Sequence, residues 1–201
     1  MNEQRSVMPK LYFKYGTMAS SKSAQALMCQ FNYEQKGMKV LLVKPAVDTR
    51  DDAEERMVRS RIGLKAPCYT ISPNESFIDL FEKASANTQY DCIIVDEAQF
   101  CTEAQIDELK QLTRKVTVIC YGLLLDFTCH LFEGSKRLVE LADSLQEIKS
   151  VCRCGRKSSV NARLVDGKCV DDGPVVLIGG DESYESMCYW CWQEELNKGK
   201  K

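Results

Sequence analysis

The segment Leu11-Tyr-Phe-Lys-Tyr-Gly-Thr-Met-Ala-Ser-Ser-Lys-Ser-Ala-Gln-Ala26 decides the fold. It reads as a short apolar strand, a tight loop of small residues, the pair Lys22-Ser23 and the start of a helix. This is the order of a phosphate-binding loop (P-loop), in which backbone N–H groups and a helix N-terminus surround a polyphosphate and the lysine reaches its outer charges. From Gly16 the pattern Gly-x-x-x-x-Gly-Lys-Ser matches at three of four defining positions, because Ser21 replaces the second glycine. A serine forced into a glycine-favouring conformation costs about 1–3 kcal/mol.

A second motif, Asp91-Cys-Ile-Ile-Val-Asp-Glu-Ala-Gln-Phe100, supports the first. Four apolar residues run into two adjacent carboxylates, which is typical of a buried parallel strand whose C-terminal end emerges at a site. Ligands of open α/β sheets bind at this edge, where the P-loop would also lie. Asp96 is therefore the expected partner of magnesium, with Ser23 supplying a hydroxyl ligand, and Glu97 is free to act as a base. The alternative is a strand capped by two solvated acids.

The composition limits the classes of partner. Lys and Arg total 27 against 29 Asp and Glu, a formal net charge of −2 over 201 residues, so a nucleic-acid backbone finds little attraction. No apolar stretch approaches the roughly 20 residues of a membrane span, and the N-terminal segment has no signal-peptide core. We expect a soluble, cytoplasmic protein that has neither a nucleic-acid polymer nor a membrane as partner.

Four of the eleven cysteines stand apart as two close pairs, Cys152-Arg-Cys154 and Cys188-Tyr-Trp-Cys191. A disulfide scaffold fits poorly with a chain of this length and no export signal. Zinc ligands commonly come as such pairs on tight turns, and a site here needs all four thiolates because the only histidine, His130, lies elsewhere. The alternatives are four unrelated thiols or a redox dithiol at Cys188 and Cys191. We predict a structural zinc site.

Strands and helices alternate through the first 150 residues, which predicts an α/β fold with a mostly parallel, P-loop NTPase-like sheet. A small C-terminal zinc-binding subdomain follows, with the boundary near Lys149-Ser150, so that the two units are 1–150 and 151–201. The charged residues 51–67 lack a stable period and predict a flexible loop. The expected elements are strands at 11–15, 39–44, 91–95 and 115–121, helices at 23–34, 75–86 and 103–112, and short strands around 160–165 and 175–178.

From Lys10 to Trp192 the chain resembles the type II thymidine kinases. The resemblance rests on many ordered motifs rather than on the imperfect P-loop alone. They are Leu-Tyr-Phe with Gly-Thr-Met in the P-loop, Lys-Pro-Ala-Val-Asp-Thr-Arg (44–50), Ser-Arg-Ile-Gly-Leu (60–64), Val-Asp-Glu-Ala-Gln-Phe (95–100), Tyr-Gly-Leu (121–123), Asp126-Phe127, Leu-Phe-Glu-Gly-Ser-Lys-Arg-Leu (131–138), Ile-Gly-Gly (178–180) and Tyr184.

The resemblance implies an ATP-dependent thymidine kinase with Glu97 as general base on the 5′-hydroxyl. Phe127 would stack on thymine, the loop from Val175 would bind the base through backbone groups, and Tyr184 would close that loop. The implied ATP-binding residues are Gly16, Thr17, Met18, Ala19, Ser20, Ser21, Lys22, Ser23, Asp48, Arg50, Asp96 and Gln99. The implied substrate-binding residues are Met18, Phe100, Leu123, Phe127, Phe132, Val175, Val176, Leu177, Ile178, Gly179 and Tyr184. The resemblance also implies zinc on Cys152, Cys154, Cys188 and Cys191, magnesium with ATP on Ser23 and Asp96, a homotetramer, and feedback inhibition by dTTP.

Each of these residues also has a purely structural interpretation: Phe127 as a core aromatic, Tyr184 as a packing residue, Gly179-Gly180 as a plain turn and Met18 as a space filler. Three rival functions remain open. One is a nucleotide-binding relative with weak or no kinase activity because of Ser21. The second is a zinc-stapled interaction module with ATP as a structural ligand, and the third is a kinase for another acceptor such as deoxyuridine.

Overall fold

The computed structural model describes residues 8–46, 56–175 and 184–199. Its elements, in chain order, are β1 (Leu11–Tyr15), α1 (Lys22–Glu34), β2 (Val40–Pro45), β3 (Met57–Arg59), β4 (Lys65–Pro67), β5 (Tyr69–Ile71), α2 (Phe77–Ser85), β6 (Cys92–Val95), the 3₁₀ turn η1 (Ala98–Phe100), α3 (Glu103–Leu112), β7 (Thr117–Gly122), α4 (Glu133–Leu141), β8 (Ser144–Glu147), β9 (Val160–Val165), β10 (Lys168–Val170), β11 (Tyr184–Met187) and α5 (Tyr189–Gly199).

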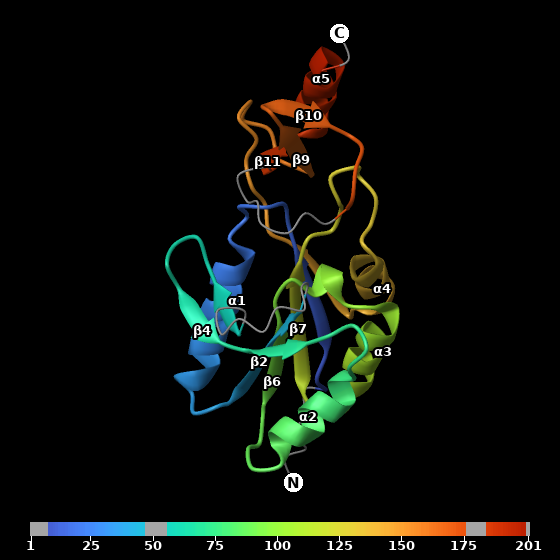
Figure 1. The fold of residues 1–201 in the computed structure, drawn as a ribbon. Helices are drawn as coiled ribbons and strands as arrows, with labels where there is room; N and C mark the ends of the chain where they lie inside the picture. The colour runs from blue at the N-terminus through green and yellow to red at the C-terminus, as the bar shows by residue number, and fades with distance from the viewer. Residues whose placement is uncertain (1–7, 47–55, 176–183, 200–201) are drawn as a thin grey trace.

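A six-stranded sheet in the order β5-β2-β6-β7-β1-β8 forms the centre of the molecule. Every neighbouring pair in it is parallel, and the register places Phe13 of β1 beside Cys120 of β7. Helices cover both faces, with α1 on one side and α3 and α4 on the other (Figure 1). The predicted parallel α/β sheet is confirmed. Because all its strands run the same way, the chain segments that follow β1, β6 and β7 meet at one edge.

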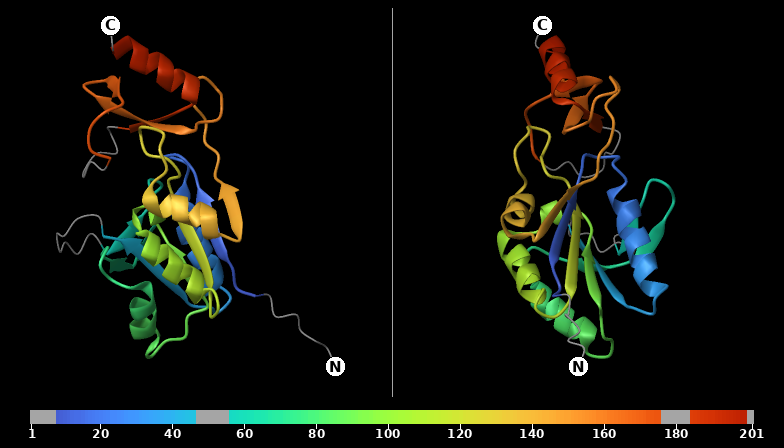
Figure 2. Two further views of the ribbon diagram at one scale, coloured as in Figure 1. Left: turned by 90° about the vertical axis from the view of Figure 1, so that its right-hand side faces the viewer. Right: turned by 180° about the vertical axis from the view of Figure 1, so that it is seen from behind.

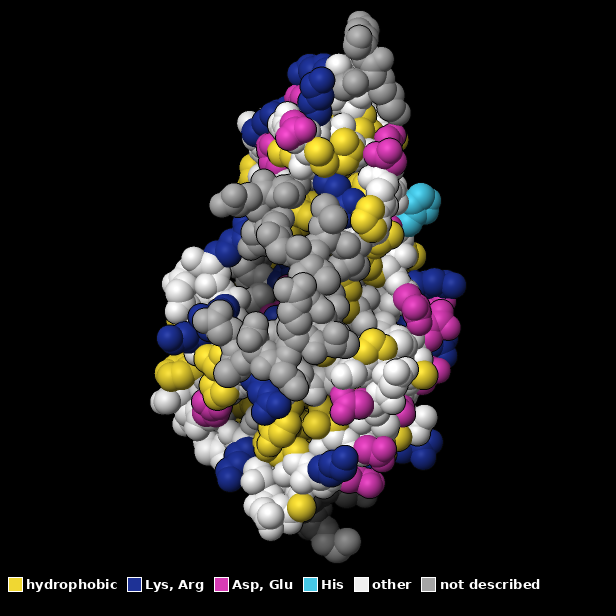
Figure 3. All heavy atoms as spheres, in the orientation of Figure 1, with side chains coloured by type: hydrophobic (Ala, Val, Ile, Leu, Met, Phe, Trp, Pro, Cys, Tyr) yellow, Lys and Arg dark blue, Asp and Glu magenta, His cyan; other side chains and the backbone are white. Residues whose placement is uncertain are grey.

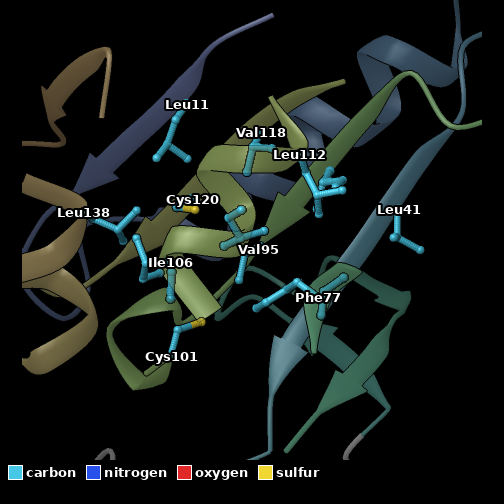
Figure 4. Packing of buried hydrophobic residues seen from close by; sticks show 14 of the residues in the cluster. Leu11, Leu41, Phe77, Val95, Cys101, Ile106, Leu112, Val118, Cys120 and Leu138 are labelled. Atoms are coloured by element: carbon cyan, nitrogen blue, oxygen red, sulfur yellow. The ribbon is translucent and has the colours of Figure 1, made fainter. Parts of the chain in front are cut away.

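Each face of the sheet has its own apolar core. The larger core, drawn in Figure 4, packs Ile106 and Leu112 of α3 and Leu138 of α4 against the sheet, together with Phe77 of α2. The smaller core places Ala26, Leu27, Val40, Leu42, Val58, Cys92, Ile94, Ile119, Tyr121 and Ile148 on the α1 side. The strands β2 and β6 contribute to both cores, which is why they read as unbroken apolar runs.

The predicted flexible loop over residues 51–67 is wrong for the part that is described. Residues 57–67 form a two-stranded antiparallel hairpin of β3 and β4. Its strands have only three residues each, too few to show a period, and Val58 is buried among the residues of the α1 side. The hairpin therefore gains its stability from tertiary packing, which local patterning does not reveal.

The C-terminal unit is a three-stranded antiparallel sheet, in the order β10-β9-β11, followed by α5. It lies beyond the edge at which the parallel strands end, with α5 at the far end of the molecule from α2 (Figures 1 and 2). The predicted strand at 160–165 is confirmed as β9. The predicted strand at 175–178 falls mostly outside the described residues. Among those residues, no helix is long and apolar enough to cross a membrane.

Candidate functional site

The loop between β1 and α1 is compact and strained. Ala19 has a φ of +58° and Ser21 a φ of +64°, the left-handed region that favours glycine. The Ser21 hydroxyl is turned toward its own backbone, because its Oγ donates to the carbonyl oxygen of Ser20 at 2.6 Å. At Gly16 there is no room for a side chain, since a Cβ would lie 2.4 Å from the carbonyl oxygen of Ile148. Residue 21, where the P-loop motif has its second glycine, thus keeps a glycine-like backbone conformation although it is a serine.

Lys22 opens α1 and is buried. Its Nζ donates to the carbonyl oxygen of Thr17 at 2.8 Å, so the ammonium group spans the loop. Helix α1 begins at this lysine, and a helix N-terminus is suited to an anion. The loop thus places a buried lysine at a helix N-terminus, and phosphate binding there stays a prediction.

Asp96 follows β6 and lies next to this loop. It is 3% exposed, and within the described parts of the chain its Oδ1 has no hydrogen-bond partner. Burial, followed by the charge of Glu97, raises the pKa of Asp96 to about 7, while a hydrogen bond from Ser23 and the charge of Lys22 act in the opposite direction. A buried carboxylate oxygen without a partner, beside a serine hydroxyl, is the donor set that Mg²⁺ takes together with phosphate oxygens. These residues fit a magnesium ion.

Glu97 is held by a glutamine that spans two strand ends. The Nε2 of Gln99 donates to the Oε2 of Glu97 at 2.5 Å, and the Oε1 of Gln99 accepts from the N–H of Leu123 at 3.0 Å. Gly122 makes this possible, because a Cβ there would lie 2.7 Å from the glutamine oxygen. Glu97 itself has a φ of +56°. The side chain of Gln99, implied for ATP binding, is thus engaged in orienting Glu97.

A pocket of about 240 Å³ lies between the loop and Glu97. Its walls come from the loop, Glu97, Leu123 and the hairpin turn with Arg59 and Arg61. Sequence reasoning missed these two arginines because it took 51–67 as an unstructured loop. The available signal was Ser60-Arg-Ile-Gly-Leu64, which matched a family motif but had no role assigned to it.

The aromatic residues predicted for a nucleobase fall into two groups. Phe100 and Phe132 meet edge to face, with ring centroids 5.7 Å apart. Phe127 is buried, and the Arg163 guanidinium lies 3.7 Å above its ring. Arg163 also donates to the hydroxyl of Tyr184, at 2.6 Å from one nitrogen and 3.0 Å from another.

Arg163 is a third residue that sequence reasoning missed. It is 2% exposed, and one of its nitrogens lies 3.4 Å from the carbonyl oxygen of Val175. It connects three predicted substrate residues that are far apart in the chain. An arginine in an ordinary strand pattern gives no signal of this burial. The remaining predicted site residues, Asp48, Arg50, Val176, Leu177, Ile178 and Gly179, lie outside the described residues.

The four predicted zinc ligands are brought together. The sulfur atoms of Cys152, Cys154, Cys188 and Cys191 all lie within 4.8 Å of one another. The Sγ atoms of Cys154 and Cys188 are 3.7 Å apart, and four sulfurs about 2.3 Å from a tetrahedral zinc are about 3.8 Å apart. The backbone N–H of Cys191 and the neighbouring thiols lower the pKa of Cys188 to about 7, whereas hydrogen bonds with the same thiols raise the pKa of Cys191 to about 12, so the four sulfurs share negative charge unequally. The donor set fits zinc.

Comparison with known proteins gives a consistent family. The model of the family described as thymidine kinase matches residues 9–192. A thymidine kinase of Enterobacteria phage T4 is 43% identical over 194 residues, which cover 95% of this chain and 99% of that protein. A thymidine kinase of Zymomonas mobilis is 40% identical over 94% of this chain and 99% of its own length. One of Legionella pneumophila strain Paris is 41% identical over 90% and 88%.

Proposed function

This chain belongs to the thymidine kinase family, and we propose that it transfers the γ-phosphoryl group of ATP to the 5′-hydroxyl of thymidine. The products are dTMP and ADP, so the reaction salvages a deoxynucleoside for DNA precursor synthesis. One observation carries the proposal. The P-loop, the buried Asp96 and the oriented Glu97 share one edge of the parallel sheet, and a single pocket contains loop residues, Glu97 and Leu123.

The phosphate side needs positioning and charge neutralisation more than covalent chemistry. In the proposal the loop from Gly16 to Ser23 binds the ATP phosphates, and Lys22 moves from the Thr17 carbonyl to the outer phosphates. Ser23 and Asp96 would hold magnesium, which neutralises charge on the phosphates. Asp48 and Arg50 complete the proposed ATP-binding set, to which Gln99 contributes only through Glu97, while Arg59 and Arg61 supply positive charge at the pocket wall.

Glu97 is the proposed general base. Its carboxylate takes the proton of the 5′-hydroxyl as the oxygen attacks the γ-phosphorus and the bond to the β-phosphate oxygen breaks. The hydrogen bond from Gln99 fixes one carboxylate oxygen, which leaves the other for the substrate. The proposed base-binding residues are Met18, Phe100, Leu123, Phe127, Phe132, Tyr184 and the segment Val175 to Gly179.

The C-terminal cysteines have a structural role in this proposal. Zinc on Cys152, Cys154, Cys188 and Cys191 would join the turn before β9 to the start of α5. A unit with a small apolar core gains folding free energy from such a metal. None of the eleven cysteines, all of them among the described residues, forms a disulfide, which suits a reducing compartment, so we place the activity in the cytoplasm.

Two regulatory features belong to the proposal. We propose a homotetramer, as the family resemblance implies; Met28 and Phe31, 51% and 58% exposed on the same side of α1, offer apolar surface to another copy of the chain. Inhibition by dTTP would follow from one molecule that offers thymine to the base subsite and a triphosphate to the P-loop.

The described part of the face in Figure 3 mixes acidic and basic side chains, which offers no broad cationic surface to a nucleic acid.

A coupled assay of ADP release against a panel of nucleosides tests the proposal. Thymidine should strongly stimulate ADP release. The ratio of the rates with thymidine and with deoxyuridine shows how strongly the 5-methyl group of thymine is recognised. The strained backbone at Ser21 favours one alternative, a nucleotide-binding relative with weak or no kinase activity. ADP binding without thymidine-dependent turnover would support that alternative and overturn the proposal.

A further inference from the structure

The C-terminal unit holds the P-loop at the Met18 peptide. The Oδ1 of Asn161 in β9 accepts from the N–H of Met18 at 2.7 Å. The Oγ of Ser186 in β11 donates to the carbonyl oxygen of the same residue at 2.5 Å. Both backbone groups of Met18 are therefore bonded to side chains that come 143 and 168 residues later in the chain.

Asn161 and Ser186, which bind the Met18 peptide, act together. Asn161 and Ser186 are directly opposite each other in the β9–β11 pairing, so their side chains share a face of that sheet. The Nδ2 of Asn161 donates at 3.2 Å to the carbonyl oxygen of Leu125, in the segment after β7. Asn161 is 4% exposed, which shields these bonds from water.

A second link reinforces the first at the preceding residue. The hydroxyls of Thr17 and Ser150 are 2.6 Å apart, and those of Ser150 and Ser158 are 2.8 Å apart. This chain of hydroxyls leads from the loop to the residues just before β9. The loop is thus fixed at two successive residues, at Thr17 through Ser150 at the boundary of the two units and at Met18 by side chains of the C-terminal sheet.

The position of these bonds explains how the loop keeps its conformation. The strained residues Ala19 and Ser21 lie one and three positions after Met18 in the chain. Backbone strain of this kind persists only where the surroundings hold it. The place of Lys22 across the loop, bonded to the carbonyl oxygen of Thr17, depends on this loop conformation.

We infer that Asn161 and Ser186 are positioning residues for ATP, which make the phosphate-binding conformation of the loop depend on the C-terminal sheet. Neither residue needs to touch the nucleotide. The inference deepens the proposed function and rests on it for the identity of the ligand. It predicts that a change in β11, outside the P-loop, weakens nucleotide binding while the zinc cysteines stay loaded.

The test measures ADP–Mg²⁺ affinity by calorimetry on the full zinc-loaded chain without thymidine. Ser186→Ala removes the donor to Met18, and the dissociation constant should rise about three- to tenfold, the range of one neutral hydrogen bond. Ser186→Thr keeps the hydroxyl and should restore the affinity. Ser159→Ala removes an exposed hydroxyl just before β9 and is the matched control, with no change expected.

Asn161→Ala should have a similar or larger effect. The double variant should lose less than the sum of the two losses, because both residues hold one peptide. Ser186→Ala with full zinc content and unchanged ADP affinity would overturn the inference. Equal weakening of ADP and thymidine binding with a lower Tm, or no rescue by threonine, would mean general loosening and would also overturn it. A parent chain that binds ADP without phosphorylating thymidine would overturn the proposed function while this comparison still stands.

Discussion

Glycine at position 21 should give a more stable protein than alanine at the same position. Ser21 has φ +64° and ψ +23°, so a residue with a Cβ there carries the left-handed penalty of about 1–2 kcal/mol. Glycine removes that penalty but increases the entropy of the unfolded chain by about 0.4–1 kcal/mol. Both variants lose the hydrogen bond from the Ser21 hydroxyl to Ser20, so its contribution cancels in the comparison.

The net expectation is that Ser21→Gly exceeds Ser21→Ala by about 1 kcal/mol in the free energy of unfolding. Urea unfolding of zinc-loaded protein without nucleotide measures the difference, provided that the slopes agree. The pair Ser159→Gly and Ser159→Ala is the control, since Ser159 has no positive φ and glycine should there be the less stable variant. The reasoning fails if alanine at 21 is as stable as glycine. In the kinase assay, Ser21→Gly should change the ATP KM or kcat by about tenfold or less.

Three further predictions concern the base, the metal and an ion pair. Glu97→Gln should lower kcat by about 10²–10⁴-fold with ADP affinity kept, and a near-native rate would exclude Glu97 as the base. Cys188→Ser should lower the zinc content below one ion per chain and lower the Tm. Cys129→Ser, outside the cluster, should keep the zinc content and the Tm of the parent protein. Elemental analysis that finds no zinc in the parent protein would contradict the site. The Lys110 ammonium, 2.6 Å away, and next the N–H of Leu11 lower the pKa of Asp143. The Asp143 carboxylate therefore stabilises the fold above its unfolded-state pKa, and this stabilisation is lost as the pH falls through the lower folded-state pKa. Asp143→Asn should therefore be less stable at pH 7 by at most about 1 kcal/mol, and urea unfolding should show the gap closing below about pH 4; a gap that is unchanged at pH 3 would refute this.

Where the decisive information is local, the sequence was sufficient. The apolar runs of β1, β2, β6 and β7 predicted the parallel sheet, because strands buried on both faces need continuous apolar residues. The order strand, small-residue loop, Lys22-Ser23 and helix is found as predicted, and Asp96 lies at the end of β6, whereas their phosphate and magnesium roles stay predictions. The cysteine spacings predicted four ligands that the structure brings within 4.8 Å.

Tertiary structure alone decided the parts that depend on distant contacts. The hairpin of β3 and β4 needs the burial of Val58 on the α1 side, and its strands are too short to show a period. The engagement of Gln99 depends on the spacing of β6 and β7, and the burial of Arg163 depends on Phe127 and Tyr184.

The hydrogen bonds of Asn161 and Ser186 with the Met18 backbone show most clearly what the sequence predicts and what only the tertiary structure decides. The sequence placed Met18 in the loop and Asn161 in a strand, but their bond joins residues 143 positions apart. Local patterns record which backbone conformation a segment prefers, since neighbouring residues set that preference. Which groups then satisfy its N–H and carbonyl is set by the packing of one unit against another, and no local pattern carries that information.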